Sequence, residues 1–382
     1  MKIFCSQEEL LRSLQMATKA LSVKTTLPIL SGLLLETRDD QLYCLATDLE
    51  LGIEVKIPEA TIIAPGKVVI QGKTFFEIIR HLSSGRIELF LDDKENLFNI
   101  KTSTSFFSLH TLPVNEFPSL PEGFRALDNL QIKSENLEDN ANFDLYFIKA
   151  PVLKEAIKQS LYATLPEDPR PFLSSVLAEF GQDQLRIVAT DINRLVIKEI
   201  KVKGEKKRNI LIPVKSLREI ANIFGNDPDE EIGIAIDERQ LFVVGKGIII
   251  SSRLIDAQFP RYEQVIPKDF TGKMKINRQV FLAALDRSSL LDKAVKLSLS
   301  EAGLIISSNE PELGTAYEEV SCDYNGDIME IGFNAQYLMD FLKNVDNEEI
   351  IFNLSSGMKA SLMSATNGED YRYIIMPLRL SV

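Results

Sequence analysis

The sequence Gly72-Lys73-Thr74 lies where an apolar stretch gives way to a pattern typical of a helix. These residue types, at such a place, can form a loop that holds the phosphate groups of a nucleotide. That loop also needs a glycine separated from Gly-Lys-Thr by four residues, because successive backbone N–H groups must wrap the phosphates. Lys67 occupies this position, and the intervening residues favour a β-strand. A nucleotide hydrolase using Gly72-Lys73-Thr74 is therefore an alternative hypothesis and not the leading one.

Two aspartates, Asp48 and Asp191, end the similar stretches LATD and VATD and suggest a second kind of chemistry. Paired carboxylates can act as general acid and base or bind Mg²⁺. Both residues stand at the same place in a repeated pattern, however, which favours a turn or capping role performed twice. The two histidines, His81 and His110, lie near no cluster of metal-binding or catalytic residues. We therefore expect no catalytic residue, no metal site and no cofactor.

Internal repetition of the sequence accounts for both patterns. LPILSGLLLE at 27–36 matches RPFLSSVLAE at 170–179, an offset of 143 residues, and Asp48 and Asp191 have the same offset. Lys73 and Lys215 are 142 residues apart and open similar helical patterns. A fainter third copy includes residues 296–310 and 330–345, and Leu217 and Tyr337 give it an offset of 120. Repeats of this length are whole domains, so we expect three of them.

Each copy contains two helical patterns, and the rest of the copy alternates in the manner of antiparallel hairpins. The expected helices are 7–20 and 73–82, 149–162 and 214–224, and 277–291 and 335–344. The fold class is α+β, with three tandem copies of a domain made of two helices and antiparallel sheet. We place the domains at 1–125, 126–268 and 269–382, with an acidic connector at about 118–144.

The charge of the chain is unevenly distributed along it. The net charge of −12 argues by itself against DNA binding, because phosphate contacts need Lys and Arg. The six expected helices, however, carry an excess of positive charge together. Salt screens charges beyond about 8 Å, so a mildly basic helical face behind an acidic exterior can accept duplex DNA without holding it tightly. No signal-peptide core or membrane span is evident, and we expect a cytoplasmic protein.

Several motifs together resemble one known family. They are LPILSGLLLE, the LATD and VATD pair, FSLHTLPVNEFPSLP, RLIDAQFPRYEQVIPK and the terminal YRYIIMPLRL. From residue 1 to 380 the chain is similar in these motifs to the β subunit of bacterial DNA polymerase III, the sliding clamp. The resemblance implies the DNA clamp fold and a homodimer whose six domains form a ring around duplex DNA without sequence preference. It also implies a non-enzymatic processivity factor of the DNA polymerase III holoenzyme, acting in DNA replication.

The resemblance further implies three sets of site residues. A hydrophobic pocket would bind short linear motifs of the DNA polymerase catalytic subunit, the clamp loader and repair proteins. Its residues would be Leu173, Thr190, Arg194, Leu195, Pro260, Val265, Ile374, Ile375, Met376, Pro377 and Leu378. The residues facing DNA would be Lys24, Arg80, Lys154, Lys158, Lys215 and Arg218. The dimer interface would bring Phe107 and Leu109 of one chain against Leu290 and Leu291 of the other.

Some of these assignments have structural alternatives. Leu173, Leu195 and Ile374, and likewise Phe107, are equally well interpreted as core residues. The chain has Ile192-Asn193 before Arg194-Leu195, where the family usually has Gly-His, and it has Ser175 where the family has Gly. The peptide preference is therefore open. A monomeric protein-binding scaffold that does not touch DNA is a third hypothesis, and the mass of the assembly separates it from a ring.

Overall fold

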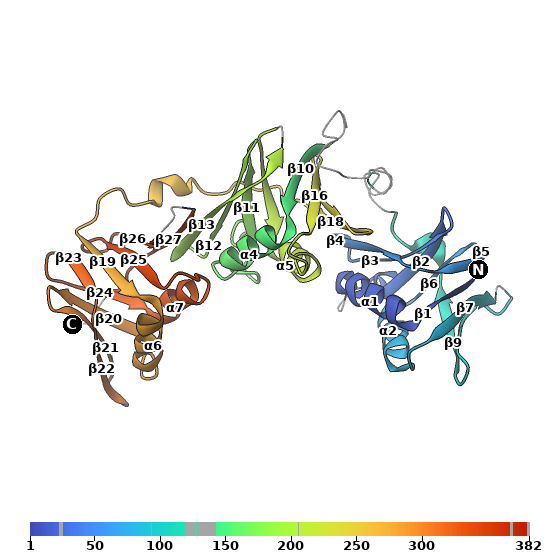
Figure 1. Ribbon diagram of the computed structural model, residues 1–382, viewed down its shortest axis with the longest axis horizontal. Helices are drawn as coiled ribbons and strands as arrows, with labels where there is room; N and C mark the ends of the chain where they lie inside the picture. Colours follow the sequence, from blue (N-terminus) through green and yellow to red (C-terminus); the bar gives the residue numbers. More distant parts are fainter. Residues whose placement is uncertain are drawn as a thin grey trace. The chain divides into compact units, whose positions relative to one another are not determined.

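The computed structural model describes residues 1–22, 26–92, 94–119, 127, 143–204, 206–366 and 370–379. They form two compact units, Met1–Ala150 with Asn222–Leu254 and Pro151–Ala221 with Ile255–Val382 (Figure 1). Most of the expected acidic connector lies outside the described residues, and so does Lys24.

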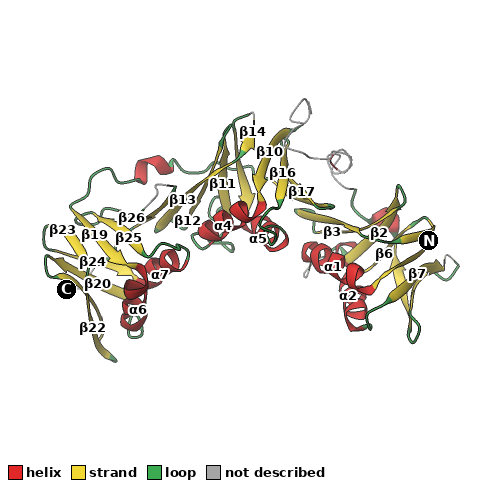
Figure 2. Cartoon of the chain, in the orientation of Figure 1, coloured by secondary structure: helices red, strands yellow, loops and turns green. Residues whose placement is uncertain are grey.

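One order of elements recurs three times in the described chain: a strand, a helix, five strands, a second helix and three strands (Figure 2). The helices are α1 (Gln7–Ala17), α2 (Gly72–His81), α4 (Ala150–Leu161), α5 (Val214–Ile223), α6 (Arg278–Ser288) and α7 (Ala335–Lys343). Their bounds agree with the six expected helices to within three residues. The expected fold class, three tandem copies of two helices with antiparallel sheet, is confirmed.

Side-chain caps explain where two of the helices begin. The Oδ1 atom of Asn277 accepts hydrogen bonds from the backbone N–H of Gln279 at 3.0 Å and of Val280 at 3.1 Å, ahead of α6. Asn334 accepts from the N–H of Gln336 at 2.9 Å, ahead of α7. The first N–H groups of a helix have no partner within it, and these asparagines supply one.

The Gly-Lys-Thr sequence lies at a junction of strand and helix. β6 (Lys67–Gln71) is followed at once by α2, which begins at Gly72. A Cβ atom on Gly72 would lie 2.7 Å from Cδ1 of Leu21 and 3.2 Å from Cβ of Leu33, so close packing requires glycine there. The nucleotide-hydrolase hypothesis loses its structural basis, because no loop of backbone N–H groups precedes the helix.

The first unit contains a continuous antiparallel sheet in the order β10-β16-β17-β18-β4-β3-β2-β6-β9-β8-β7-β1-β5. Besides β6, its strands are β1 (Lys2–Ser6), β2 (Gly32–Arg38), β3 (Gln41–Thr47), β4 (Leu51–Ile57), β5 (Thr61–Ala64), β7 (Arg86–Asp92), β8 (Leu97–Lys101), β9 (Phe106–Leu112), β10 (Asp144–Lys149), β16 (Glu231–Ile236), β17 (Gln240–Gly245) and β18 (Ile248–Arg253). β4 of the first copy pairs with β18 of the second, with Ile53 opposite Ile250. The sheet thus passes from one copy of the repeat into the next.

The second unit contains two antiparallel sheets, β15-β11-β12-β13-β27-β26-β25-β19-β23 and β22-β21-β20-β24. Their strands are β11 (Ser175–Phe180), β12 (Gln184–Thr190), β13 (Arg194–Lys201), β15 (Arg208–Pro213), β19 (Gly272–Asn277), β20 (Ala294–Ser300), β21 (Gly303–Glu310), β22 (Gly314–Val320), β23 (Asp323–Gly326), β24 (Met329–Asn334), β25 (Glu349–Leu354), β26 (Ser361–Ala365) and β27 (Tyr371–Ile375). Here β13 of the second copy pairs with β27 of the third, with Leu195 opposite Ile374.

These two pairings explain why the compact units do not coincide with the repeats. The middle copy contributes β10, β16, β17 and β18 to the first unit and β11, β12, β13 and β15 to the second. Backbone hydrogen bonds join each group to a neighbouring copy through a ladder of five residue pairs. Three domains bounded near residues 125 and 268 therefore stay a prediction.

Aromatic contacts hold the helices against the sheets. In the first unit Phe75 of α2 meets Phe98 of β8 edge to face, with ring centroids 5.9 Å apart. In the second unit Phe341 of α7 stacks on Tyr373 of β27 at 5.3 Å. These four side chains are buried. None of the helices within the described ranges is long and apolar enough to cross a membrane.

Candidate peptide groove and assembly surfaces

Four of the residues expected in the peptide pocket, Arg194, Leu195, Ile374 and Ile375, lie in the pairing of β13 with β27 in the second unit. Four other expected residues are exposed, namely Pro260, Val265, Met376 and Leu378. Thr190 is half-buried, and the others are buried: Leu173, Arg194, Leu195, Ile374, Ile375 and Pro377. Val265 is 53% exposed, Met376 39% and Leu378 40%, so three large apolar side chains remain open to solvent. We call these three residues the apolar rim.

The buried members belong to the core near the apolar rim. Leu195 and Ile374 lie opposite each other across β13 and β27 and share a cluster with Tyr262. Tyr262 belongs to the short 3₁₀ helix η4 (Tyr262–Val265), which also carries Val265. Leu195 and Ile374 therefore support the site from within and present little surface to a ligand. This agrees with the alternative interpretation that they are core residues.

Arg194 is held by charge and aromatic contacts on every side. Its Nε donates to Oδ2 of Asp191 at 2.8 Å, and its Nη1 donates to Oδ2 of Asp340 at 2.6 Å. The guanidinium carbon lies 4.1 Å from the ring centroid of Tyr337 and 5.3 Å from that of Tyr162. Arg194 is 8% exposed. It links β13 to α7 and has little surface left for contact with a peptide.

The surroundings of Arg194, Tyr162 and Tyr373 raise the pKa values of these three side chains. Burial by itself would lower the pKa of Arg194, but Tyr373, Asp340 and Asp191 outweigh burial and the net effect raises it. Burial raises the pKa of the Tyr373 hydroxyl, and it also raises that of Tyr162. The guanidinium therefore stays charged and both hydroxyls stay protonated over the physiological pH range.

Asp48 and Asp191 perform the same structural role in two copies. Oδ1 of Asp191 accepts from the N–H groups of Asn193 and Arg194, both at 3.0 Å. Oδ1 of Asp48 accepts from the N–H groups of Glu50 and Leu51 in the same way, at 3.0 and 2.7 Å. The structure thus confirms that these aspartates close turns. Within the described ranges no group of three His, Cys, Asp or Glu side chains is placed to hold a metal.

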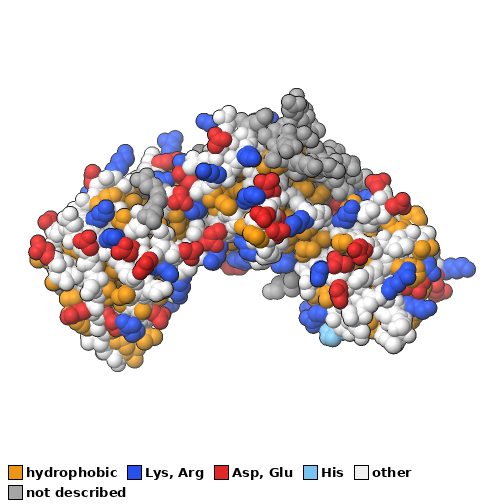
Figure 3. Space-filling model, in the orientation of Figure 1, with side chains coloured by type: hydrophobic (Ala, Val, Ile, Leu, Met, Phe, Trp, Pro, Cys, Tyr) orange, Lys and Arg blue, Asp and Glu red, His pale blue; other side chains and the backbone are white. Residues whose placement is uncertain are grey.

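The basic residues expected to face DNA stand on helices wherever they are described. Arg80, Lys158, Lys215 and Arg218 are exposed, and Lys154 is half-buried. Arg80 forms an ion pair with Glu77 at 2.6 Å, and Lys158 lies 3.9 Å from Glu155. Acidic and basic side chains are also interspersed over the face drawn in Figure 3. Partial neutralisation of this kind weakens the attraction for phosphate groups.

β9 and β22 each have an edge along which no other strand pairs in the described part of the chain, and β5, β15 and β23 are also edge strands of their sheets. β9 pairs with β8 along residues 106–110, and with β6 only at Thr111 and Leu112. β22 pairs with β21 alone. Large apolar side chains are exposed on both strands, with Phe106 at 60%, Phe107 at 39% and Tyr317 at 60%. Unprotected edges of this kind are templates for pairing with another chain.

The residues expected at the dimer interface lie beside these edges. Phe107 and Leu109 are on β9, opposite the buried Ile100 and Phe98 of β8, so they point to the core side of the sheet at its margin. Leu290, which is 79% exposed, and the half-buried Leu291 follow α6. α6 in turn contacts β22, and Arg287 of α6 binds both carboxylate oxygens of Glu318 on β22, at 2.8 and 2.6 Å.

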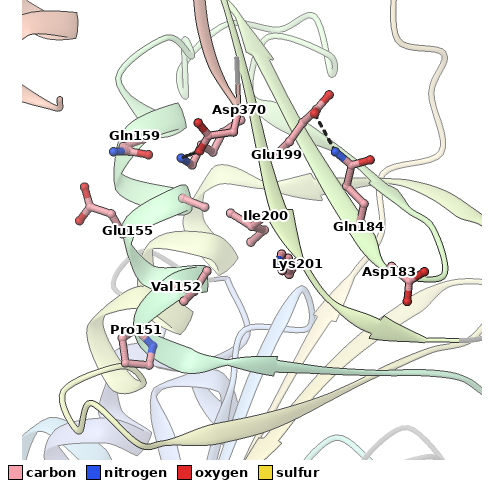
Figure 4. Close-up of a pocket in the computed structure, with 12 residues that line it drawn as sticks. Pro151, Val152, Glu155, Gln159, Asp183, Gln184, Glu199, Ile200, Lys201 and Asp370 are labelled. Carbon is pink, nitrogen blue, oxygen red and sulfur yellow. Dashed lines mark hydrogen bonds and ion pairs between the residues drawn. The ribbon is translucent and has the colours of Figure 1, made fainter. Parts of the chain in front are cut away.

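A separate cavity of about 900 Å³ lies between α4 and the β12–β13 hairpin (Figure 4). Val152, Ala156 and Ile200 are among its apolar lining residues, and none of the expected pocket residues takes part. Several polar groups at its border already have partners. Glu199 accepts from Nε2 of Gln184 at 2.6 Å, and Lys198 pairs with Asp370 at 2.6 Å. These groups need no ligand, and we assign the cavity no role.

Sequence patterns did not identify several residues that shape these sites. Asp340 is 146 positions from Arg194 along the chain, so no local motif connects them. Tyr162 and Tyr337 look like ordinary helix-associated aromatics in the sequence. Tyr317 could have been found, because it follows the third copy of the hairpin and belongs to an alternating strand.

Comparison with family models assigns all three copies. Residues 1–121 match the N-terminal domain, 147–261 the central domain and 263–379 the C-terminal domain of the DNA polymerase III β subunit. The chain belongs to this family. It is 31% identical to the β sliding clamp of Bacillus subtilis, over 99% of this chain and 100% of the relative. It is 30% identical to the β sliding clamp of Pseudomonas aeruginosa, over 98% of each chain.

Solved sliding clamps share the fold along the whole chain. The Bacillus subtilis clamp superposes with a TM-score of 0.91 at 30% identity, covering 100% of both chains. A Pseudomonas aeruginosa clamp bound to griselimycin superposes with a TM-score of 0.89 at 29% identity, again covering 100% of both. The resemblance noted in the sequence is thus confirmed at the level of family and fold.

Proposed function

We propose that two copies of the chain close a ring around duplex DNA in the cytoplasm and act there as a non-enzymatic processivity factor. The names of the relatives support a sliding clamp of DNA replication. The three copies of one domain, each with two helices, supply the parts of a six-domain ring. A closed ring stays on DNA by topology, so its contacts with the backbone can be weak and independent of sequence.

The observation that carries this proposal is the way in which successive copies are joined. β4 of the first copy pairs with β18 of the second, and β13 of the second pairs with β27 of the third. In the recurring order of elements β22 is the counterpart of β4 and β13, and β9 is the counterpart of β18 and β27. The missing junction is therefore β22 of one chain with β9 of another. Both strands have a free edge at which this pairing can form.

The two junctions within the chain also predict the register in which β22 of one chain would pair with β9 of another. Ile197 on β13 pairs with Arg372, and its counterpart Glu54 on β4 pairs with Ile249. When the repeated hairpins of the copies are aligned, Tyr317 on β22 takes the place of Ile197 on β13. In the same way Phe106 on β9 takes the place of Ile249 on β18. Phe106 of one chain would thus lie opposite Tyr317 of the other. Such a cross-strand aromatic pair favours association by about 0.2–1 kcal/mol beyond its backbone hydrogen bonds.

A head-to-tail contact of this kind must close to give a finite assembly. Phe107 and Leu109 lie on the core side of β9, and Leu290 and Leu291 follow the helix that contacts β22. These residues would meet on the helical side of the joined sheets, as the resemblance implies. Burying these residues against a second chain removes the apolar surface that a single chain exposes.

Protein partners would bind at the apolar rim. Met376 and Leu378 are flexible apolar side chains beside the buried Pro377, which cannot donate to a sheet. Short linear motifs of the DNA polymerase catalytic subunit, the clamp loader and repair proteins are the proposed ligands. The griselimycin complex of the Pseudomonas aeruginosa clamp supports the view that clamps of this fold bind ligands.

We also propose that the three copies act as three domains, at 1–125, 126–268 and 269–382. The three family models match residues 1–121, 147–261 and 263–379, which supports a division into three domains with the second boundary a few residues before 268. Strand pairing across each boundary then serves as a stiff joint between neighbouring domains.

A topological experiment tests the ring. The protein is loaded by a clamp loader onto a nicked circular duplex, washed in high salt, and the circle is then cut once with a restriction enzyme. We expect the protein to stay on the circle through the wash and to leave after the cut, with a mass in solution equal to two chains. A chain of monomer mass, or one that leaves the circle in salt, would support the scaffold hypothesis instead.

A further inference from the structure

Ile192 combines an unfavourable backbone conformation with an exposed apolar side chain. Its φ is 80°, in the left-handed region where glycine, asparagine and aspartate are usual and a β-branched residue is rare. Ile192 is nevertheless 56% exposed, so packing of its side chain in the core does not explain why this residue occupies the position. Residues held in such conformations occur preferentially at binding sites.

The turn that carries Ile192 is held rigidly. The N–H of Ile192 donates to Oγ1 of Thr190 at 3.1 Å, and the next two N–H groups donate to Asp191. The Thr190 hydroxyl donates to the carbonyl oxygen of Arg194 at 2.7 Å, and Arg194 in turn is fixed by Asp191 and Asp340. The Ile192 side chain therefore projects from a backbone that cannot easily move aside.

Met376 of the apolar rim lies directly beside this turn. The N–H of Met376 donates to the carbonyl oxygen of Asn193 at 2.8 Å, which places Ile192 one residue from that contact. Met376 and Leu378 are both exposed. Ile192 thus adds a fourth exposed apolar side chain, and unlike the methionine it is short, branched and restricted in χ1.

The first copy contains a matched turn without the apolar rim. Leu49 has φ of 79°, is 53% exposed, and donates its N–H to Oγ1 of Thr47 at 3.0 Å. The strand beside it donates from the N–H of Arg253 to the carbonyl oxygen of Glu50 at 2.8 Å. Arg253 thus takes the place that Met376 has next to Ile192. The positive φ is therefore a feature of both turns. The two turns differ in their neighbour, which is the apolar Met376 beside Ile192 and the charged Arg253 beside Leu49.

We propose that Ile192 is a specificity-determining residue of the peptide groove, a fixed wall that favours an aliphatic peptide side chain over an aromatic one. The proposal rests on the proposed binding of linear motifs at the apolar rim. A flexible methionine can repack around a large ring, whereas a branched side chain on an immobile turn cannot. A side chain that fits between them gains apolar contact, and a larger one must distort the turn or sit less deeply in the groove.

The test uses the full-length protein and fluorescence anisotropy with two labelled peptides. Both are about ten residues long and come from the C-terminus of the polymerase catalytic subunit, with the apolar residues all Leu in one and all Phe in the other. We expect the unmodified protein to prefer the Leu peptide by about tenfold. In Ile192→Gly the preference should fall to about twofold or less, because glycine adopts this φ without strain and removes the wall.

Three further variants make the outcome decisive. Leu49→Gly makes the same change in the matched turn and should keep the preference, and Ile192→Val should keep it because the branched wall remains. If Ile192→Gly keeps the preference for the Leu peptide, Ile192 does not determine specificity. This holds even if Met376→Ala with Leu378→Ala abolishes binding and so supports the groove itself. If that double variant binds both peptides as the unmodified protein does, or if the unmodified protein binds neither, the groove itself is wrong and the role of Ile192 falls with it.

Discussion

The guanidinium of Arg194 and the carboxylate of Asp340 form an ion pair of 2.6 Å that joins β13 of the second copy to α7 of the third. The side chains of Arg194 and Asp340 are only 8% and 19% exposed. Removing one partner of a largely buried pair leaves the other charge without its compensating neighbour. Asp340 also accepts from Nε2 of Gln336 at 2.6 Å, so it is fixed in turn.

Asp340→Ala should therefore destabilise the protein by about 2–4 kcal/mol and weaken peptide binding, since Arg194 supports the turn of Ile192. The free energy of unfolding is measured in urea by tyrosine fluorescence, which is suitable because the chain has nine tyrosines and no tryptophan. Asp340→Asn is the control. It keeps an oxygen acceptor for Arg194 and should lose less than half as much stability. Equal stability of Asp340→Ala and the unmodified protein would show that the pair contributes little.

Changes on and beside the free edge of β22 should convert the dimer to monomer. The double change Leu290→Ala with Leu291→Ala removes apolar surface beside β22, and Tyr317→Lys puts a charge at the proposed cross-strand pair. Sedimentation velocity at micromolar protein concentration measures the mass. Ile328→Lys is the control, because Ile328 is 84% exposed in the same unit but is not on β22. A double variant that remains fully dimeric would refute the assignment of Leu290 and Leu291, and a dimeric Tyr317→Lys would refute the register.

Loss of basic residues from the helices should weaken binding to linear DNA but not retention on a circle. Lys158→Ala, Lys215→Ala and Arg218→Ala are combined, and the salt dependence of binding to a linear duplex should become shallower. The slope of log K against log [salt] should change by about 0.9 for each phosphate group that the protein no longer neutralises. Gel-shift titration at several salt concentrations measures the slope.

The control for this variant combines Lys101→Ala, Lys201→Ala and Lys273→Ala, which remove the same charge from exposed positions on strands. The slope should stay close to that of the unmodified protein in the control. Equal effects of the two sets, or tight sequence-specific binding to a short duplex, would contradict the proposed role of the helices.

Truncation of the apolar rim should abolish peptide binding and leave the ring intact. Met376→Ala with Leu378→Ala removes two side chains whose full burial contributes about 1.5–3 kcal/mol each, a large share of the roughly 8 kcal/mol that micromolar binding requires. Isothermal titration with the polymerase C-terminal peptide measures the affinity, and retention on circular DNA measures the ring. Ile328→Ala with Met358→Ala is the control, because these residues are exposed in the same unit. Unchanged peptide affinity in the first variant would mean that the groove lies elsewhere.

Local patterns in the sequence were sufficient to predict the helices and the threefold repeat. Helical and strand periodicity depend on residues within a few positions of one another, and the offsets of 143, 142 and 120 residues are visible without any knowledge of contacts. Motif resemblance then indicated the family. Local patterns also suggested a nucleotide-binding loop at Gly72. They could not show that Leu21 and Leu33 pack closely against that glycine.

Only the tertiary structure decided which residues of the candidate site are exposed and how they are held. Leu195 and Met376 are both apolar in the sequence, yet one is buried between strands and the other open to solvent. Arg194 meets Asp340 across 146 positions, and Ile192 has a backbone conformation that its residue type disfavours. Contacts between distant segments create each of these features, and periodicity carries no information about such contacts. The sequence by itself thus determined the repeated elements, whereas packing between the copies decided the groove, its rigid turn and the free edges of β9 and β22.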